Sequence, residues 1–263
     1  LLPLSGGQQI GMNINADQFV LSYHATLVDV SAKADGIGFR IDFDGGSRTF
    51  QFGYIDNSNY ALRICDEWSG KYGLALTDEL AQTSGIDIMI VRDGSKFTAY
   101  YRLNENDAWA QAGNTLDLNN ITGFSIFNWT TGYKLTNIAY TPSLEPLNVT
   151  VTAEAMEHGT VTMAEENAKL GDIVTLTVTP EEGYFLSQLT VNGKDFTAQV
   201  QDGKLVLSNV GWTELKVSAQ FGQEPVKTKL FQPNDQFQVS QDETELLPLS
   251  GGQQIGMNIN ADQ

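Results

Sequence analysis

The chain has 263 residues, of which 32 are acidic and 15 are basic, so its formal net charge at pH 7 is −17. Nucleic acids and anionic lipid surfaces attract clustered lysine and arginine, and this charge argues against both as partners. Hydrophobic residues make up 41% of the chain and charged residues 18%, which is typical of a globular protein. No apolar stretch approaches the ~20 residues that span a bilayer, so no membrane insertion is expected.

A long exact duplication dominates the sequence. Residues 1–18 and residues 246–263 both read LLPLSGGQQIGMNINADQ. The copies start 245 residues apart (246 minus 1), so the chain is expected to be one period of a tandem array plus a short overlap. Such a period exceeds the roughly 20–50 residues of a solenoid unit and holds two ordinary domains. We therefore expect both ends of the chain to be cut points within a domain.

The first half of the chain predicts short strands separated by turns. Residues 37–43 alternate between apolar and polar side chains, with Phe39 and Ile41 among the apolar ones, and residues 50–54 repeat the pattern. This period of two predicts half-buried strands. Asp44-Gly45-Gly46-Ser47 and Asp56-Asn57-Ser58-Asn59 are turn signals, and the second leads into a strand at residues 60–65.

Further strands follow as far as residue 140. Residues 86–91 and 96–103 predict a hairpin with Asp93-Gly94 at its turn. Residues 124–129 alternate again, and residues 135–140 predict a last strand before Pro142 and Pro146 mark a linker. Many short strands at regular spacing predict an antiparallel β-sandwich or jelly roll.

Three segments of this region, GFRIDFDG, FTAYYRLN and ITGFSIFNWTTGYKLTNIAYTP, resemble concanavalin-like (laminin-G-like) lectin domains. The resemblance implies that residues 1–145 form such a domain, without its first strand. Residues 230–239, LFQPNDQFQV, precede the second copy of the opening segment and are expected to be the first strand of the next lectin-like repeat. Residues 223–263 are thus expected to be a linker followed by the first strands of that repeat.

Residues 147–222 have a different pattern. Gly159-Thr160-Val161, a strand from residue 174 to 178 that alternates with threonine, Gly183-Tyr184 and a closing strand at 217–221 resemble the divergent internalin-type B repeat. Asn192-Gly193 predicts a type I′ hairpin turn. The resemblance implies a small β-grasp-like module at residues 146–222, a type that spaces other domains in long surface proteins of Gram-positive bacteria.

The resemblance to lectin domains makes glycan binding the first chemistry to consider. Binding needs an aromatic platform for the sugar face and a few fixed polar groups. Alternation places Arg40, Asp42, Gln51, Arg63, Tyr100 and Arg102 opposite the core, so we expect them to line one concave face, flanked by Trp68, Tyr72 and Trp109. The alternative is that these arginines only pair with carboxylates across strands. The predicted ligand-binding set is Arg40, Gln51, Arg63, Trp68, Tyr72, Tyr100 and Arg102.

Calcium is the one candidate cofactor, because oxygen ligands from loops suit it. Asp42, Asp44, Asp56 and Asn57 are the predicted ligands. Catalysis is not expected: glycoside hydrolysis needs two carboxylates across the scissile bond, and neither Asp42 with Asp44 nor Asp66 with Glu67 has a glycosidase pattern.

Three functions remain open. The first is a non-enzymatic repeat unit of a long bacterial cell-surface protein, an adhesin or stalk whose lectin-like domains bind host or bacterial glycans. The second is a structural filament or surface-layer subunit in which neighbouring repeats or identical chains join head-to-tail by strand complementation, with residues 230–239 pairing within or between chains. The third is a polysaccharide-degrading enzyme with accessory modules. All three place the chain outside the cell.

Overall fold

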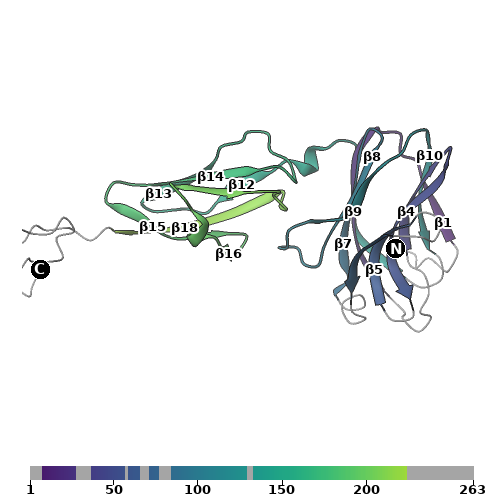
Figure 1. The fold of residues 1–263 in the computed structure, drawn as a ribbon, viewed down its shortest axis with the longest axis horizontal. Coiled ribbons are helices and arrows are strands. Elements are labelled where there is room, and N and C mark those ends of the chain that lie inside the picture. Colours follow the sequence, from purple (N-terminus) through teal and green to yellow (C-terminus); the bar gives the residue numbers. More distant parts are fainter. Residues whose placement is uncertain are drawn as a thin grey trace, which may run out of the picture.

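The structure, a computed structural model, describes residues 8–27, 37–56, 59–65, 71–76, 84–128 and 133–223 (Figure 1). Within these ranges the regular structure is β-strand with two short 3₁₀ turns, which confirms the predicted all-β class. No helix in the described part is long and apolar enough to cross a membrane. Residues 224–263, including the predicted first strand at 230–239 and the second copy of the opening segment, lie outside the described residues.

Eleven strands form two antiparallel sheets that face each other. The six-stranded sheet has the order β1 (Gln8–Met12), β10 (Ile121–Asn128), β3 (Ile37–Phe43), β4 (Gly46–Asp56), β5 (Asn59–Cys65) and β6 (Lys71–Leu76). The five-stranded sheet has the order β11 (Tyr133–Thr141), β2 (Gln18–Leu27), β7 (Ile86–Asp93), β8 (Lys96–Arg102) and β9 (Ala110–Asp117). The first copy of the duplicated segment therefore supplies β1, which pairs with β10 of the same chain.

The predicted hairpin at residues 86–103 is formed by β7 and β8. Gly94 lies in its turn with a φ of +64°, a left-handed conformation that glycine adopts without steric cost. Beyond the hairpin, β8 pairs with β9 through an irregular register between Phe97 and Ala99.

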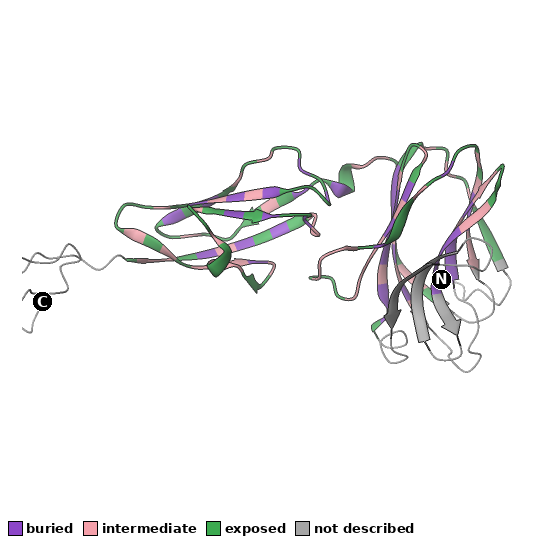
Figure 2. Cartoon of the chain, in the orientation of Figure 1, coloured by how far each residue is buried: buried purple, intermediate pink, exposed green. Residues whose placement is uncertain are grey.

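The sandwich core is made by the alternate residues of both sheets. The ring of Phe124 lies 5.6 Å from the rings of Phe19 and Phe39 and 6.1 Å from that of Phe97. These four phenylalanines come from β10, β2, β3 and β8, so one aromatic cluster joins the two sheets. Figure 2 shows the resulting alternation of buried and exposed residues along the strands.

The second module has its own core between two small sheets. One sheet has the order β12 (Thr150–Ala153), β18 (Glu214–Gln223), β15 (Tyr184–Val191) and β16 (Lys194–Asp195), with β12 and β18 parallel. The other has the order β13 (Gly159–Met163), β14 (Val174–Pro180) and β17 (Lys204–Leu207). Asn192 and Gly193 connect β15 to β16 with φ angles of 49° and 75°, as a type I′ turn requires.

The second module docks on the outer face of the five-stranded sheet. Leu147, in the 3₁₀ turn Glu145–Leu147, and Leu170, in the loop before β14, are buried there. They form one apolar cluster with the outward-facing Val20, Met89 and Val91. Burial of apolar side chains from both modules makes this contact a packed joint rather than a flexible tether.

Two loops meet beside this cluster. The backbone N–H of Trp109 donates to the carbonyl of Gly211 at 2.6 Å, and the indole Nε1 of Trp212 donates to the carbonyl of Asn106 at 3.1 Å. A Cβ atom at Gly211 would lie 2.6 Å from the Cβ atom of Ala108, which is closer than real Cβ contacts. Glycine at position 211 therefore allows the loops to approach.

We expect Phe124→Ala to lower the free energy of unfolding of the sandwich by about 3–5 kcal/mol, because it removes the ring that joins four buried aromatics. Chemical denaturation followed by circular dichroism measures the loss. Phe185→Ala is the matched control, since Phe185 is 45% exposed on the second module and its removal should cost much less. Equal losses from the two substitutions would contradict the assignment of Phe124 to the core.

We expect Gly211→Leu to open the joint without unfolding either module, because the added side chain collides with Ala108 and Trp109. Small-angle scattering should show a larger radius of gyration. Burial raises the pKa of Tyr100, which packs against the joint cluster, so opening the joint should lower that pKa towards its ordinary value near 10 in an NMR titration. Gly11→Ala, at a glycine with open space around it, should change neither property.

Candidate functional site

The outer face of the six-stranded sheet carries the polar side chains that suit a ligand. Its strand register aligns Ser125 of β10, Arg40 of β3 and Thr49 of β4 in one row across the sheet. Ser125 and Arg40 lie between core-packed residues along their strands, and Thr49 directly precedes the core residue Phe50. All three therefore project away from the core. This row is the centre of the candidate site.

Burial of polar groups distinguishes this face. Within the described part of the chain, the buried polar side chains are those of Thr49, Gln51 and Ser125, with exposures of 5%, 1% and 1%. The amide of Gln9 on β1 donates to the hydroxyl of Ser125 at 2.8 Å. Buried hydroxyl and amide groups are costly unless they are hydrogen-bonded, so their concentration on one face marks a polar floor rather than an ordinary solvated surface.

A charged pair lies beside this floor. Arg40 Nε donates to Asp42 Oδ1 at 2.7 Å, and the two side chains are 33% and 29% exposed. This half-buried pair holds a guanidinium group, a planar donor, next to Thr49 and Ser125. Gly38 lies in the next row, where a Cβ atom would collide with Thr49 Cγ2, so the absence of a side chain at position 38 makes room for the threonine.

Backbone register brings two further predicted residues to the same sheet. Arg63 of β5 lies opposite Gln51 of β4, and Tyr72 of β6 lies opposite Arg63. Arg40, Gln51, Arg63 and Tyr72 thus belong to the strands of one sheet, and their role in binding stays a prediction. Trp68 lies outside the described residues, so its predicted place beside the face stays a prediction.

The prediction of a single face was wrong for Tyr100 and Arg102. Both are on β8, which belongs to the five-stranded sheet, so they lie on the opposite side of the sandwich from Arg40 and Gln51. A period of two assigns a residue to the inside or the outside of a sheet but does not say to which sheet its strand belongs. Tyr100 instead packs against the joint cluster.

Arg102 serves the joint as well. Its Nε atom donates to Asp87 Oδ2 at 2.9 Å, and its guanidinium group lies 4.5 Å from the ring centre of Trp109. Asp87 also contacts His24 Nδ1 at 2.7 Å, so a polar row crosses β2, β7 and β8 on the face against which the second module docks.

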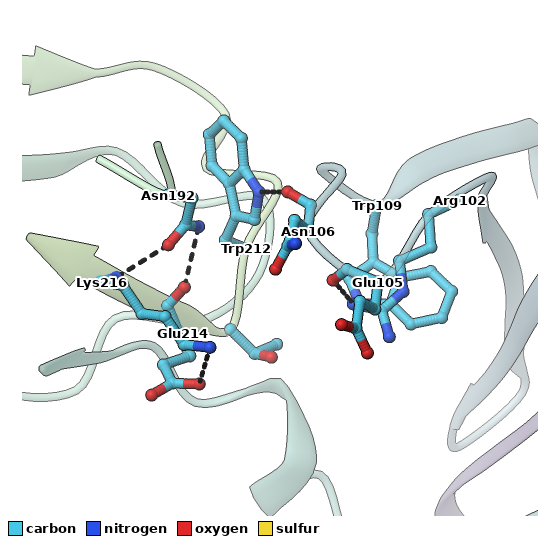
Figure 3. A pocket seen from close by; sticks show the side chains of 9 residues that line it. Arg102, Glu105, Asn106, Trp109, Asn192, Trp212, Glu214 and Lys216 are labelled. Atoms are coloured by element: carbon cyan, nitrogen blue, oxygen red, sulfur yellow. Dashed lines mark hydrogen bonds and ion pairs between the residues drawn. The ribbon is translucent and has the colours of Figure 1, made fainter. Parts of the chain in front are cut away.

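A cleft between the modules is the other place where functional side chains gather (Figure 3). It has a volume of about 120 Å³, and its lining includes Arg102, Trp109, Trp212, Asn192, Glu214 and Lys216. The side chain of Asn192 donates to the carbonyl of Glu214 at 3.0 Å and accepts from the backbone N–H of Lys216 at 2.8 Å. The Asn192 bonds fix the β15–β16 turn to β18 within the second module, and the Trp212 bond to Asn106 crosses to the sandwich. We therefore assign the cleft to the joint and not to ligand binding.

Calcium binding by Asp42, Asp44, Asp56 and Asn57 stays a prediction. The carboxylate of Asp42 already accepts from Arg40, and Asp44 is exposed. The side chain of Asp56 and all of Asn57 lie outside the described residues. Within the described ranges no three histidine, cysteine, aspartate or glutamate side chains gather as a metal site would require.

Sequence reasoning missed Ser125, Thr49 and Gln9. The alternation along residues 121–128 does place Ser125 on the other face of the strand from Phe124 and Ile126. The same period-2 rule could therefore have found it. Gln9 had no comparable signal, because only the pairing of β1 with β10 brings it to Ser125.

Several solved structures are similar to about half of the chain. The carbohydrate-binding module CBM66 from Bacillus subtilis is 10% identical, with a TM-score of 0.35, over 52% of this chain and 83% of its own. Sheep galectin-11 is 14% identical, with a TM-score of 0.30, over 52% of this chain and 99% of its own. A xylan β-1,4-xylosidase from Bacillus halodurans is 11% identical, with a TM-score of 0.40, over 51% of this chain and 30% of its own.

The chain therefore spans about 30% of the length of the glycoside hydrolases among these structures. No curated protein shows significant sequence similarity to the chain.

The second module has a family assignment. Residues 149–225 match the family model of the divergent InlB B-repeat domain. The match covers the whole second module from β12 to β18 and confirms the resemblance that residues 147–222 predicted. This part of the chain is therefore similar to the divergent InlB B-repeat domain.

Proposed function

We propose that the chain is a repeat unit of a bacterial cell-surface protein and that its sandwich binds glycans on the outer face of the six-stranded sheet. The observation that carries the proposal is the row of Ser125, Arg40 and Thr49, with buried Gln51 beside it. Hydroxyl, amide and guanidinium groups fixed by a rigid sheet are the donors and acceptors that sugar hydroxyls need.

The position of the second module supports this choice of face. The module covers apolar side chains on the five-stranded sheet, including Val20 and Val91, so that face serves the joint. The outer face of the six-stranded sheet is then the one that the joint does not cover, and Arg40 is 33% exposed on it. Docking of the B-repeat-like module on the opposite side of the sandwich leaves this face clear of the joint.

Repetition supports a surface role. A sheet face that binds one glycan unit weakly gains apparent affinity when many copies share one chain, because each further binding event is intramolecular. The exact duplication of residues 1–18 at 246–263 is the sign of such an array. The B-repeat-like module would space the sandwiches along it, and the net charge of −17 would keep them from binding nucleic acids or anionic lipids.

The second candidate function is structural. In this alternative the units bind each other head-to-tail and form a filament or surface layer, and no glycan is recognised. The exposed apolar side chains along β11 favour contact between units. Contact of this kind is compatible with glycan binding, so the two functions are tested separately.

The test of glycan binding uses the full chain on a glycan array, with Arg40→Ala against Arg48→Ala. Arg48 lies opposite core-facing Ile41 in the same strand pair, so its side chain is not part of the proposed face. We expect Arg40→Ala to weaken binding about 10- to 100-fold, since a hydrogen bond to a charged group contributes about 1.5–3 kcal/mol. Arg48→Ala should bind as the parent does.

Three results would count against the proposal. Absence of binding to every glycan would favour the structural alternative. Equal losses from the two arginine variants would place binding elsewhere. Release of reducing sugar by the purified chain would revive the enzyme hypothesis.

A further inference from the structure

The sandwich has two lateral edges, which we call margins, where the terminal strands of its two sheets lie. At one margin the two sheets contact each other, and at the other apolar side chains are exposed. At the closed margin, β9 of the five-stranded sheet contacts β5 and β6 of the six-stranded sheet. The opposite margin is bounded by β11 and β1, the other terminal strands of the two sheets. Ile10 on β1 and Ile138 and Tyr140 on β11 are 51%, 54% and 41% exposed there. They are three of the six exposed large hydrophobic residues in the described part of the chain, so apolar exposure is concentrated at this margin.

The exposed margin has the properties of a strand acceptor. No described strand lies beyond β11 in its sheet. A terminal strand presents backbone N–H and C=O groups that a further strand can pair with. The ring of Tyr140 lies 5.8 Å from that of Phe19, so a side chain placed over Tyr140 would extend the sandwich core.

A segment of this chain has the matching pattern. In residues 230–239 the apolar Phe237 and Val239 alternate with Gln236 and Gln238. Pro233 suits a strand at the edge of a sheet, because proline has no backbone N–H to donate to a neighbouring strand. The segment also directly precedes the second copy of residues 1–18, which is the sequence that forms β1 of the sandwich. By sequence order it therefore belongs with a sandwich built from that second copy.

The length of the chain keeps the start of this segment away from β11 of its own chain. β18 starts at Glu214, beside the joint, and its ten residues extend about 30 Å away from the sandwich. Figure 1 shows the described chain ending at the far end of the second module. The seven Cα–Cα steps from Gln223 to Leu230 cover at most about 25 Å, so Leu230 cannot return even to the level of Glu214.

We propose that residues 230–239 pair with β11 of a second copy of this unit and join successive units head-to-tail. The proposal deepens the structural alternative above and does not depend on glycan binding. Since the donor segment and the acceptor strand are different surfaces, the contact is heterologous and does not close after two chains. Free chains should therefore assemble into open rows, while in a longer array the same pairing would connect each unit to the next.

Light scattering of the full chain over a range of concentrations is the first test. We expect the average mass to rise with concentration in the parent, and to stay at one chain in the donor variant Phe237→Asp and in the acceptor variant Tyr140→Asp. An equimolar mixture of the two variants has one intact donor and one intact acceptor, so it should give a 1:1 dimer and nothing larger. Ile173→Asp is the matched control, because Ile173 is 60% exposed on the second module and should leave assembly unchanged.

Three outcomes of this test would overturn the proposal. One is a parent that stays a single chain at every concentration. Another is an equal effect of Ile173→Asp and Tyr140→Asp. The third is assembly that survives Phe237→Asp but is abolished by Ile255→Asp, because Ile255 is the second copy of Ile10 and its loss would point to exchange of β1 instead.

A second test fills the acceptor within one chain. A second copy of residues 224–245 placed ahead of Leu1 supplies the donor strand in cis, so the extended chain should be monomeric at concentrations where the parent assembles. Its sandwich should also unfold at a higher temperature. Unchanged assembly and unchanged unfolding would refute strand donation. Glycan-array binding of the same protein reports separately on the proposed function, so failure of one proposal is distinguishable from failure of the other.

Discussion

The docking of the second module on the five-stranded sheet is the contact on which the rest of the molecule depends. A two-sheet sandwich has two outer faces, and Leu147 and Leu170 cover apolar side chains on one of them. This contact leaves the polar face of the six-stranded sheet clear of the joint. It also sets the direction of β18, which carries the chain away from the sandwich.

Two arginines show how the joint divides the chemistry of the surface. Arg40 and Arg102 both project from strands of the sandwich, and each pairs with a carboxylate through its Nε atom. Arg40 lies beside buried hydroxyl groups on the free face, whereas Arg102 stacks on Trp109 between the modules. The same residue type therefore packs between the modules in one place and is proposed to bind a ligand in the other, because burial and neighbours differ.

A packed joint also has consequences for a tandem array. Identical neighbouring domains risk exchanging strands during folding, and alternation with an unlike module separates them. Since the modules contact through loops that Gly211 allows to approach, each unit would present its polar face at a fixed angle to the unit's axis. A fixed angle would preserve the spacing of the proposed binding sites, on which avidity depends.

The sequence by itself determined the elements and the repetition. Period-2 alternation identified the strands around Phe39, Phe124 and Leu176, and the hairpin turn at Asn192-Gly193 followed from the need for positive φ at both residues. The exact duplication of residues 1–18 predicts a tandem array with a period of 245 residues. These features are short-range residue patterns or an exact sequence match, so the amino-acid sequence alone reveals them.

Only the tertiary structure decided which strands share a sheet. Alternation places Arg40 and Tyr100 on the outside equally well, but hydrogen bonding assigns β3 and β8 to different sheets and so separates them. Ser125 and Gln9 are more than a hundred positions apart in the sequence. Only the pairing of β1 with β10 makes them neighbours. The site depends on this long-range pairing, which no local pattern of residues encodes.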